Sequence, residues 1–179
     1  MPVHTVRRAP FCSACSVLSY IWHHPSNRGR RFRVLARAVS WQLYKRTVGG
    51  YWDVRLAGSR VIRCHPDSTS ASSVLYAGLF DYDVMHFLLR YLRPEDNFLD
   101  VGANIGVYTV LASSVVTAGE LHAFEPSPLA LERLEESVRL NRLTNVQVHR
   151  VRSSRDARNH ALHAEPRYFQ SHRSRACGR

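Results

Sequence analysis

Acidic residues are absent from the first fifty positions of this 179-residue sequence, and lysine is almost absent throughout. Lys45 is the single lysine among 25 basic residues, so arginine carries nearly all of the positive charge. Residues 1–50 hold nine basic side chains, whereas residues 51–150 hold nine basic and twelve acidic ones. The net charge of +11 therefore belongs to the two ends of the chain. So strong an arginine bias weakens any inference from basicity alone to nucleic-acid binding.

Long apolar runs are also missing, and none approaches the roughly 18 residues that a membrane span needs. Four cysteines are too few for a disulfide framework of this length. Cys12 and Cys15 form a single C-x-x-C pair, and the other possible zinc ligands are His23, His24, Cys64 and His65. A zinc site would need a second C-x-x-C or an H-x-x-x-H beside that pair, and the sequence has neither, so we expect no metal.

The N-terminus faintly resembles an export signal, with Arg7 and Arg8 ahead of residues 11–22. That segment contains three serines and lacks a clean apolar core, so we expect a cytoplasmic protein. Residues 1–50 are expected to form a basic helical lead-in, of which residues 1–27 read as irregular. Residues 30–46 predict a basic amphipathic helix, which Gly49 and Gly50 end. Its apolar stripe would consist of Phe32, Leu35, Ala36, Val39, Leu43 and Tyr44.

A β-hairpin and a loop are expected next, over residues 51–73. Residues 51–56 and 60–64 alternate between apolar and polar side chains around Gly58, which is typical of two paired strands. Residues 66–73 are polar and rich in serine, which indicates a loop. Residues 152–179 have little aliphatic content and seven arginines, so we predict a disordered basic tail.

The middle of the chain, residues 74–151, alternates between strand and helix patterns. Asp81 and Asp83 precede a helix, because a carboxylate there can accept free backbone N–H groups. Ser127, followed by proline, predicts the start of a later helix, because a serine hydroxyl can also accept a free backbone N–H and proline suits the first helical position. The order β-α-β-α-β predicts an α/β fold with a partial parallel sheet, preceded by the basic helix and the hairpin. The expected strands are 97–101, 121–125 and 145–149, and the expected helix between the first two is 105–116.

One loop in this unit has the features of a ligand site. Gly102 allows a tight turn directly after the strand, where a Cβ would clash, and Gly106 allows the next helix to approach the sheet. Asn104 is one of the few residue types that tolerate a left-handed conformation. Glu125 ends the next strand, where a carboxylate can accept hydrogen bonds from two ribose hydroxyls. The sequence therefore predicts a nucleoside-binding site at the carboxyl ends of the strands.

The identity of the nucleoside follows from what this loop lacks. The spacing G-x-x-x-G differs from the dinucleotide fingerprint G-x-G-x-x-G, and no P-loop is present. In the dinucleotide fingerprint the second glycine lets the backbone come close to the pyrophosphate. S-adenosylmethionine carries no phosphate, so a loop that binds it does not need that glycine. Asp100 suits its ammonium group, directly or through water, and the helix start near Gly106 suits its carboxylate. The pattern favours S-adenosylmethionine as the cofactor.

The sequence resembles the FkbM family of S-adenosylmethionine-dependent methyltransferases over residues 74–151. The resemblance rests on residues 98–106 with Tyr108 and Thr109, on residues 122–126, and on residues 141–146. It implies the N-terminal half of a Rossmann-like methyltransferase domain. It also implies O-methyl transfer to a hydroxyl of a small molecule or a sugar. By position, the cofactor-binding residues would be Asp100, Gly102, Asn104, Gly106 and Glu125, and Asp81 would match the acidic residue before the first strand.

The family pattern stops after Val151, because no strand with an Ile-Asp-Val-Glu-Gly-like motif follows. We therefore expect a C-terminally truncated or frameshifted chain with little or no methyltransferase activity, since the acceptor side and any general base would be missing. Two other functions stay open: an inactive remnant, and a module that binds nucleic acid or an anionic surface. The second would use Arg30, Arg31, Arg33, Arg37, Lys45 and Arg46 with Phe32, Trp41 and Tyr44.

Overall fold

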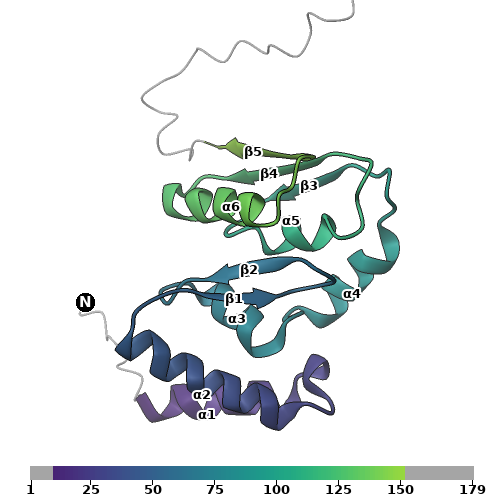
Figure 1. Cartoon of the computed structure of the whole chain (residues 1–179). Helices are drawn as coiled ribbons and strands as arrows, with labels where there is room; N and C mark the ends of the chain where they lie inside the picture. The colour runs from purple at the N-terminus through teal and green to yellow at the C-terminus, as the bar shows by residue number, and fades with distance from the viewer. Residues whose placement is uncertain (1–9, 152–179) are drawn as a thin grey trace, which may run out of the picture.

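The computed structural model describes residues 10–151, and it opens with two helices that lie side by side (Figure 1). These are α1, Pro10–His23, and α2, Arg31–Thr47, joined by the 3-10 turn η1, Pro25–Asn27. The irregular lead-in expected for residues 1–27 is therefore wrong from Pro10 onward. No glycine or proline interrupts residues 11–23, and the fully buried Ile21 ties the helix to the core, which outweighs the serines.

Helix α2 confirms the predicted basic helix, but of the predicted apolar stripe only Leu35 and Tyr44 pack against the core, and both are only partly buried. The buried residues of α2 are Val34, Ala38 and Trp41, whereas Phe32 is 79% exposed. Helix α2 thus has apolar side chains on two opposite sides. The indole of Trp41, which packs edge-on against Trp52, is the largest fully buried side chain and selects the inward side.

The predicted hairpin is confirmed as β1, Trp52–Arg55, and β2, Val61–Cys64, which pair antiparallel. The loop expected at residues 66–73 is only partly correct, because helix α3 occupies Thr69–Ala77. The Ser68 hydroxyl accepts a hydrogen bond from the Ala71 N–H at 3.2 Å. Serine thus begins a helix here, and the buried residues that follow hold that helix against the core.

The remaining elements form the predicted α/β unit. They are α4, Tyr82–Tyr91; β3, Phe98–Val101; α5, Val107–Ala112; β4, Leu121–Glu125; α6, Pro128–Leu140; and β5, Val146–Arg150. The three strands are parallel, in the order β3-β4-β5, which confirms the partial parallel sheet and the α/β class. Helices α5 and α6 lie on the same face of this sheet (Figure 1), as two right-handed crossovers require. Helix α5 is shorter than the expected 105–116 at both ends: it begins only after Gly106, which adopts a left-handed conformation, and it ends at Ala112.

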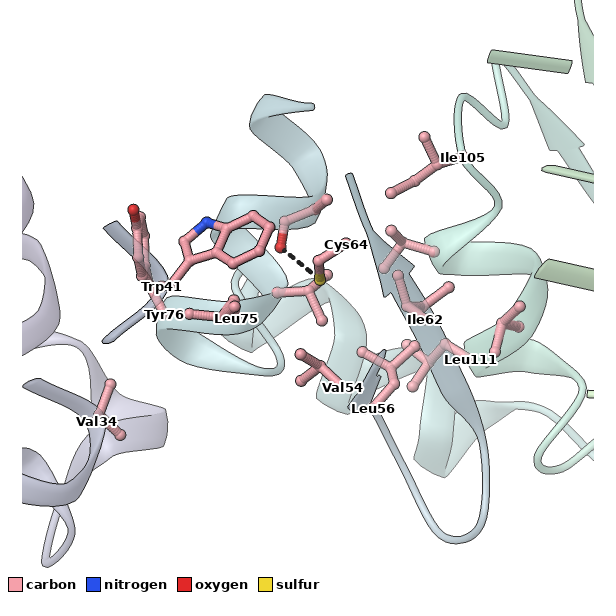
Figure 2. Packing of buried hydrophobic residues seen from close by; sticks show 14 of the residues in the cluster. Val34, Trp41, Val54, Leu56, Ile62, Cys64, Leu75, Tyr76, Ile105 and Leu111 are labelled. Atoms are coloured by element: carbon pink, nitrogen blue, oxygen red, sulfur yellow. Dashed lines mark hydrogen bonds between the residues drawn. The ribbon is translucent and has the colours of Figure 1, made fainter. Parts of the chain in front are cut away.

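A cluster of buried residues runs from α1 through the hairpin to α5. Figure 2 shows Trp41 and Leu75 on one side of the hairpin and Leu111 of α5 on the other. The Cys64 thiol lies within this core and donates to the Ala71 carbonyl at 3.2 Å, and burial raises its pKa to about 12. The cluster contains residues from all three expected segments, 1–50, 51–73 and 74–151. These segments therefore meet in one core, although their division into domains stays a prediction.

Polar contacts also join the hairpin to α6. The Arg63 guanidinium donates to Asp53 at 2.8 Å and to Glu136 at 2.9 Å, while His65 Nε2 lies 2.7 Å from Glu136. The Asn141 side chain pairs with both the N–H and the C=O of Val61 at 2.7 Å. These contacts set the position of the hairpin against the α/β unit.

Two predictions concern features outside these elements. Within residues 10–151 no helix combines the length and the apolar character needed to cross a membrane. The expected disordered tail, residues 152–179, lies outside the described residues.

Candidate functional site

The predicted ligand loop leaves β3 at the carboxyl end of the parallel sheet. It runs from Gly102 to Gly106 and leads directly into α5. The N–H groups of Gly102 and Ala103 both donate to the Phe124 carbonyl, at 2.8 and 3.0 Å. The loop is therefore fixed to the end of β4, which brings it beside Glu125.

Three residues of the loop have positive φ angles. They are Gly102 at +83°, Asn104 at +53° and Gly106 at +86°. A Cβ built on Gly106 would lie 2.6 Å from Leu134 Cδ1 of α6, so the close approach is to this helix, whereas the sequence suggested the sheet. A Cβ on Gly102 would meet no atom within 4 Å, so the expected steric clash is wrong and the reason for glycine there is conformational. The space beside Gly102 is open.

Glu125 links the loop to the turn before α6. Its Oε2 accepts a hydrogen bond from the Asn104 N–H at 2.8 Å, and its Oε1 accepts one from the Ser127 N–H at 2.8 Å. The residue is 6% exposed. A carboxylate oxygen has two lone pairs, so each oxygen of Glu125 keeps one after these bonds. The expectation that the Ser127 side chain caps α6 is wrong, because its hydroxyl makes no capping bond and its backbone binds Glu125.

Asp100 lies beneath the same loop and is held by α5. Its Oδ2 accepts a hydrogen bond from the Thr109 hydroxyl at 2.6 Å. Burial raises the pKa of this carboxyl, and the charge of Glu125 raises it further against the opposing effect of Thr109. The structure thus engages Asp100 in anchoring α5 to β3.

A second carboxylate near α5 extends this arrangement. Asp81 does not cap α4 with its side chain, contrary to expectation, but accepts a hydrogen bond from the Tyr108 hydroxyl at 2.8 Å. Burial and the Asp81 carboxylate raise the pKa of Tyr108 well above its usual range. The pairing was not predicted, because residues 27 positions apart carry no local pattern that joins them.

These residues can be tested against a nucleoside cofactor. Glu125 has the free lone pairs that two ribose hydroxyls need, and the open space at Gly102 admits a ligand against the backbone. Neither feature requires a phosphate. No group of three or more metal-ligating side chains occurs in the part of the chain described here. These residues therefore fit the ribose of the nucleoside that the sequence suggested.

No protein-family model matches this chain. It is 30% identical over 82 residues to Methyltransferase 1 of Beauveria bassiana (strain ARSEF 2860), a match that covers 45% of this chain and 30% of that protein. The chain thus spans less than a third of the length of this relative.

Solved structures of two methyltransferases are similar to parts of the chain. Coclaurine N-methyltransferase, bound to N-methylheliamine and S-adenosylhomocysteine, is 16% identical, with 86% of this chain and 47% of that chain covered and a TM-score of 0.39. Methyltransferase FkbM of Methylobacillus flagellatus KT is 18% identical, with 68% and 34% covered and a TM-score of 0.33.

Proposed function

We propose that this chain binds S-adenosylmethionine and belongs to a methyltransferase. The observation that carries the proposal is the Glu125 carboxylate. It is buried at the carboxyl end of β4, holds two loops by their backbone N–H groups, and retains one lone pair on each oxygen. The partial relative, a methyltransferase by name, supports the same class.

Each proposed site residue has a part in this binding. Glu125 accepts the two ribose hydroxyls, and Gly102 and Asn104 shape the loop beside them. Gly106 allows α6 to come close, and Asp100 holds α5 in place below the loop, within reach of water-mediated contact with an ammonium group. When bound, S-adenosylmethionine supplies an electrophilic methyl group. We assign no general base.

The acceptor is proposed from the resemblance alone. An FkbM-type enzyme would transfer the methyl group to a hydroxyl of a small molecule or a sugar. The family assignment and the cytoplasmic location also stay predictions. Turnover of S-adenosylmethionine with a panel of sugar and small-molecule alcohols would test the acceptor class independently of cofactor binding.

The cofactor is best tested by changing the ligand, because substitution of Glu125 also removes a partner from two backbone N–H groups. We would titrate the full chain by calorimetry with S-adenosylhomocysteine and with its 2′-deoxy and 3′-deoxy analogues. Loss of a hydrogen bond to a charged group costs about 1.5–3 kcal/mol, so each analogue should bind roughly tenfold to a hundredfold more weakly. Equal affinity for all three ligands would remove Glu125 from the ribose site, and no binding of any would refute the proposal.

A further inference from the structure

The outward side of α2 carries an apolar stripe that the core does not use. Phe32, Ala36, Val39 and Leu43 follow one another at spacings of four, three and four residues, which places them on one side of a helix. Val39 and Leu43 are 54% and 57% exposed. Helices α1 and α2 lie at the end of the molecule opposite the parallel sheet (Figure 1), far from the candidate cofactor site.

Arginines surround this stripe. Arg33 and Arg46 are exposed on its two flanks. At its N-terminal end a hollow of about 540 Å³ is lined by Trp22, Gly29, Arg30, Arg31, Phe32 and Arg33. The Arg31 guanidinium lies over the Trp22 ring at 5.1 Å, and its buried Nε has no hydrogen-bond partner in the described part of the chain. An anionic oxygen entering the hollow can contact the arginine side chains that line it.

We propose that the α1–α2 face docks on the surface of an anionic phospholipid bilayer. The stripe enters the boundary between headgroups and acyl chains, Trp22 lies at that boundary, and the arginines contact lipid phosphates. This inference goes beyond the proposed cofactor site and does not depend on it.

The charge distribution favours a bilayer over two other occupants. A second copy of the chain would bring together two surfaces from residues 1–50, which have nine basic and no acidic residues, and they would repel each other. A nucleic acid would contact the arginines, but the aliphatic side chains of Val39 and Leu43 offer no stacking to bases and would stay in water. An anionic bilayer, which has an apolar layer beneath its charged headgroups, satisfies both features.

The first experiment measures co-sedimentation of the full chain with vesicles of phosphatidylcholine alone or mixed with phosphatidylserine. We expect binding to the mixed vesicles and at least tenfold less to the neutral ones, with weakening as salt rises. Brominated acyl chains in the mixed vesicles should quench the fluorescence of Trp22. Trp22→Phe should remove most of this quenching, because Trp41 is fully buried and Trp52, on the hairpin, is partly buried against the same core.

Matched variants separate the apolar from the electrostatic contribution. Phe32→Ser with Leu43→Ser should weaken vesicle binding at least tenfold, whereas Val84→Ser with Phe87→Ser on the exposed side of α4 should leave it unchanged. Arg33→Glu should weaken binding at least fivefold, and Arg55→Glu, an equal charge change on the hairpin, should have a smaller effect.

Several results would overturn the proposal. These are equal binding to neutral and anionic vesicles, absence of quenching by brominated lipid, or equal effects of the paired variants. Binding of a 20-nucleotide RNA without vesicle binding would assign the face to nucleic acid. A dimer that Phe32→Ser dissociates, again without vesicle binding, would assign it to a second copy.

Discussion

At the scale of single residues, the two glycines of the candidate loop serve different purposes. Both have φ angles near +85°, a region in which a side chain costs about 1–2 kcal/mol. Only at Gly106 would a Cβ also collide with a neighbour, Leu134 Cδ1 at 2.6 Å. A side chain at Gly102 would therefore introduce backbone strain alone, whereas a side chain at Gly106 would introduce both backbone strain and a steric contact.

We predict that Gly106→Ala lowers the free energy of unfolding more than Gly102→Ala. Gly102→Ala should cost about 1–2 kcal/mol from the backbone alone, and Gly106→Ala a further 1–3 kcal/mol from the contact with Leu134. Urea denaturation of both variants measures the difference. Equal losses would mean that α6 moves away from the loop without cost.

Asp100 provides a second residue-scale prediction, on pH dependence. Because its pKa is raised in the folded state, the stability that it contributes is present below its ordinary pKa and is lost as pH rises through the folded value. Asp100→Asn keeps an acceptor for the Thr109 hydroxyl but removes the buried charge. The variant should be more stable than the wild-type protein at pH 7, and the gap should narrow toward about pH 4. Thermal unfolding at both values tests this, and a less stable variant at pH 7 would contradict it.

At the scale of elements, helix α6 connects the hairpin to the sheet through Glu136. Burial alone would raise the pKa of Glu136, but hydrogen bonds from His65 and Arg63, with their charges, lower it. A carboxyl whose pKa is lowered by folding stabilises the fold at pH values above its ordinary pKa. This contribution is lost as pH falls through the pKa of the folded state. The contact between hairpin and α6 should therefore weaken in acid.

Glu136→Gln should lower the melting temperature at pH 7, and the difference from the wild-type protein should be smaller at pH 3, because the wild-type carboxylate becomes protonated as pH falls through its lowered pKa. The control is Glu135→Gln on the same helix, since Glu135 pairs with Arg139 at 3.5 Å on the exposed side. Its effect should stay below about 0.5 kcal/mol. Melting curves at the two pH values decide, and identical shifts for both variants would exclude a role for the hairpin contact.

At the scale of the whole molecule, the parallel sheet leaves one side uncovered. Helices α5 and α6 cover the opposite face, and β3 pairs only with β4 among residues 10–151. On this strand Leu99 is 61% exposed and Val101 is 81% exposed. An edge strand with exposed apolar side chains recruits other chains.

We predict marginal stability and aggregation of the isolated chain. Leu99→Lys should reduce the aggregated fraction in light scattering, because charge on an edge strand opposes pairing. Leu129→Lys on α6, a residue of similar exposure, should not. A soluble monomer that melts cooperatively well above about 50 °C would contradict the prediction.

Local patterns predicted much of the fold and of the site. Alternation located the hairpin, and the β-α-β-α-β order located the sheet, because each depends on side chains close in sequence. The left-handed conformation of Asn104 was predicted for the same reason, whereas that of Gly106, which lies inside the expected helix 105–116, was not. The pairing of Glu125 with the Asn104 N–H was not predicted, since it depends on how two crossovers bring separate turns together.

The sequence by itself determined the strand and helix order from α4 to β5, the parallel sheet and the residue types of the ligand loop, because these depend on spacing and on backbone preferences of single residues. The tertiary structure decided which side of α2 is buried. Both sides of that helix carry apolar residues, and only packing against Trp52 and α3 chooses Trp41 over Phe32. It also decided that Asp81 bonds Tyr108 and that Asp100 anchors α5, because a carboxylate takes the donor that packing brings within reach.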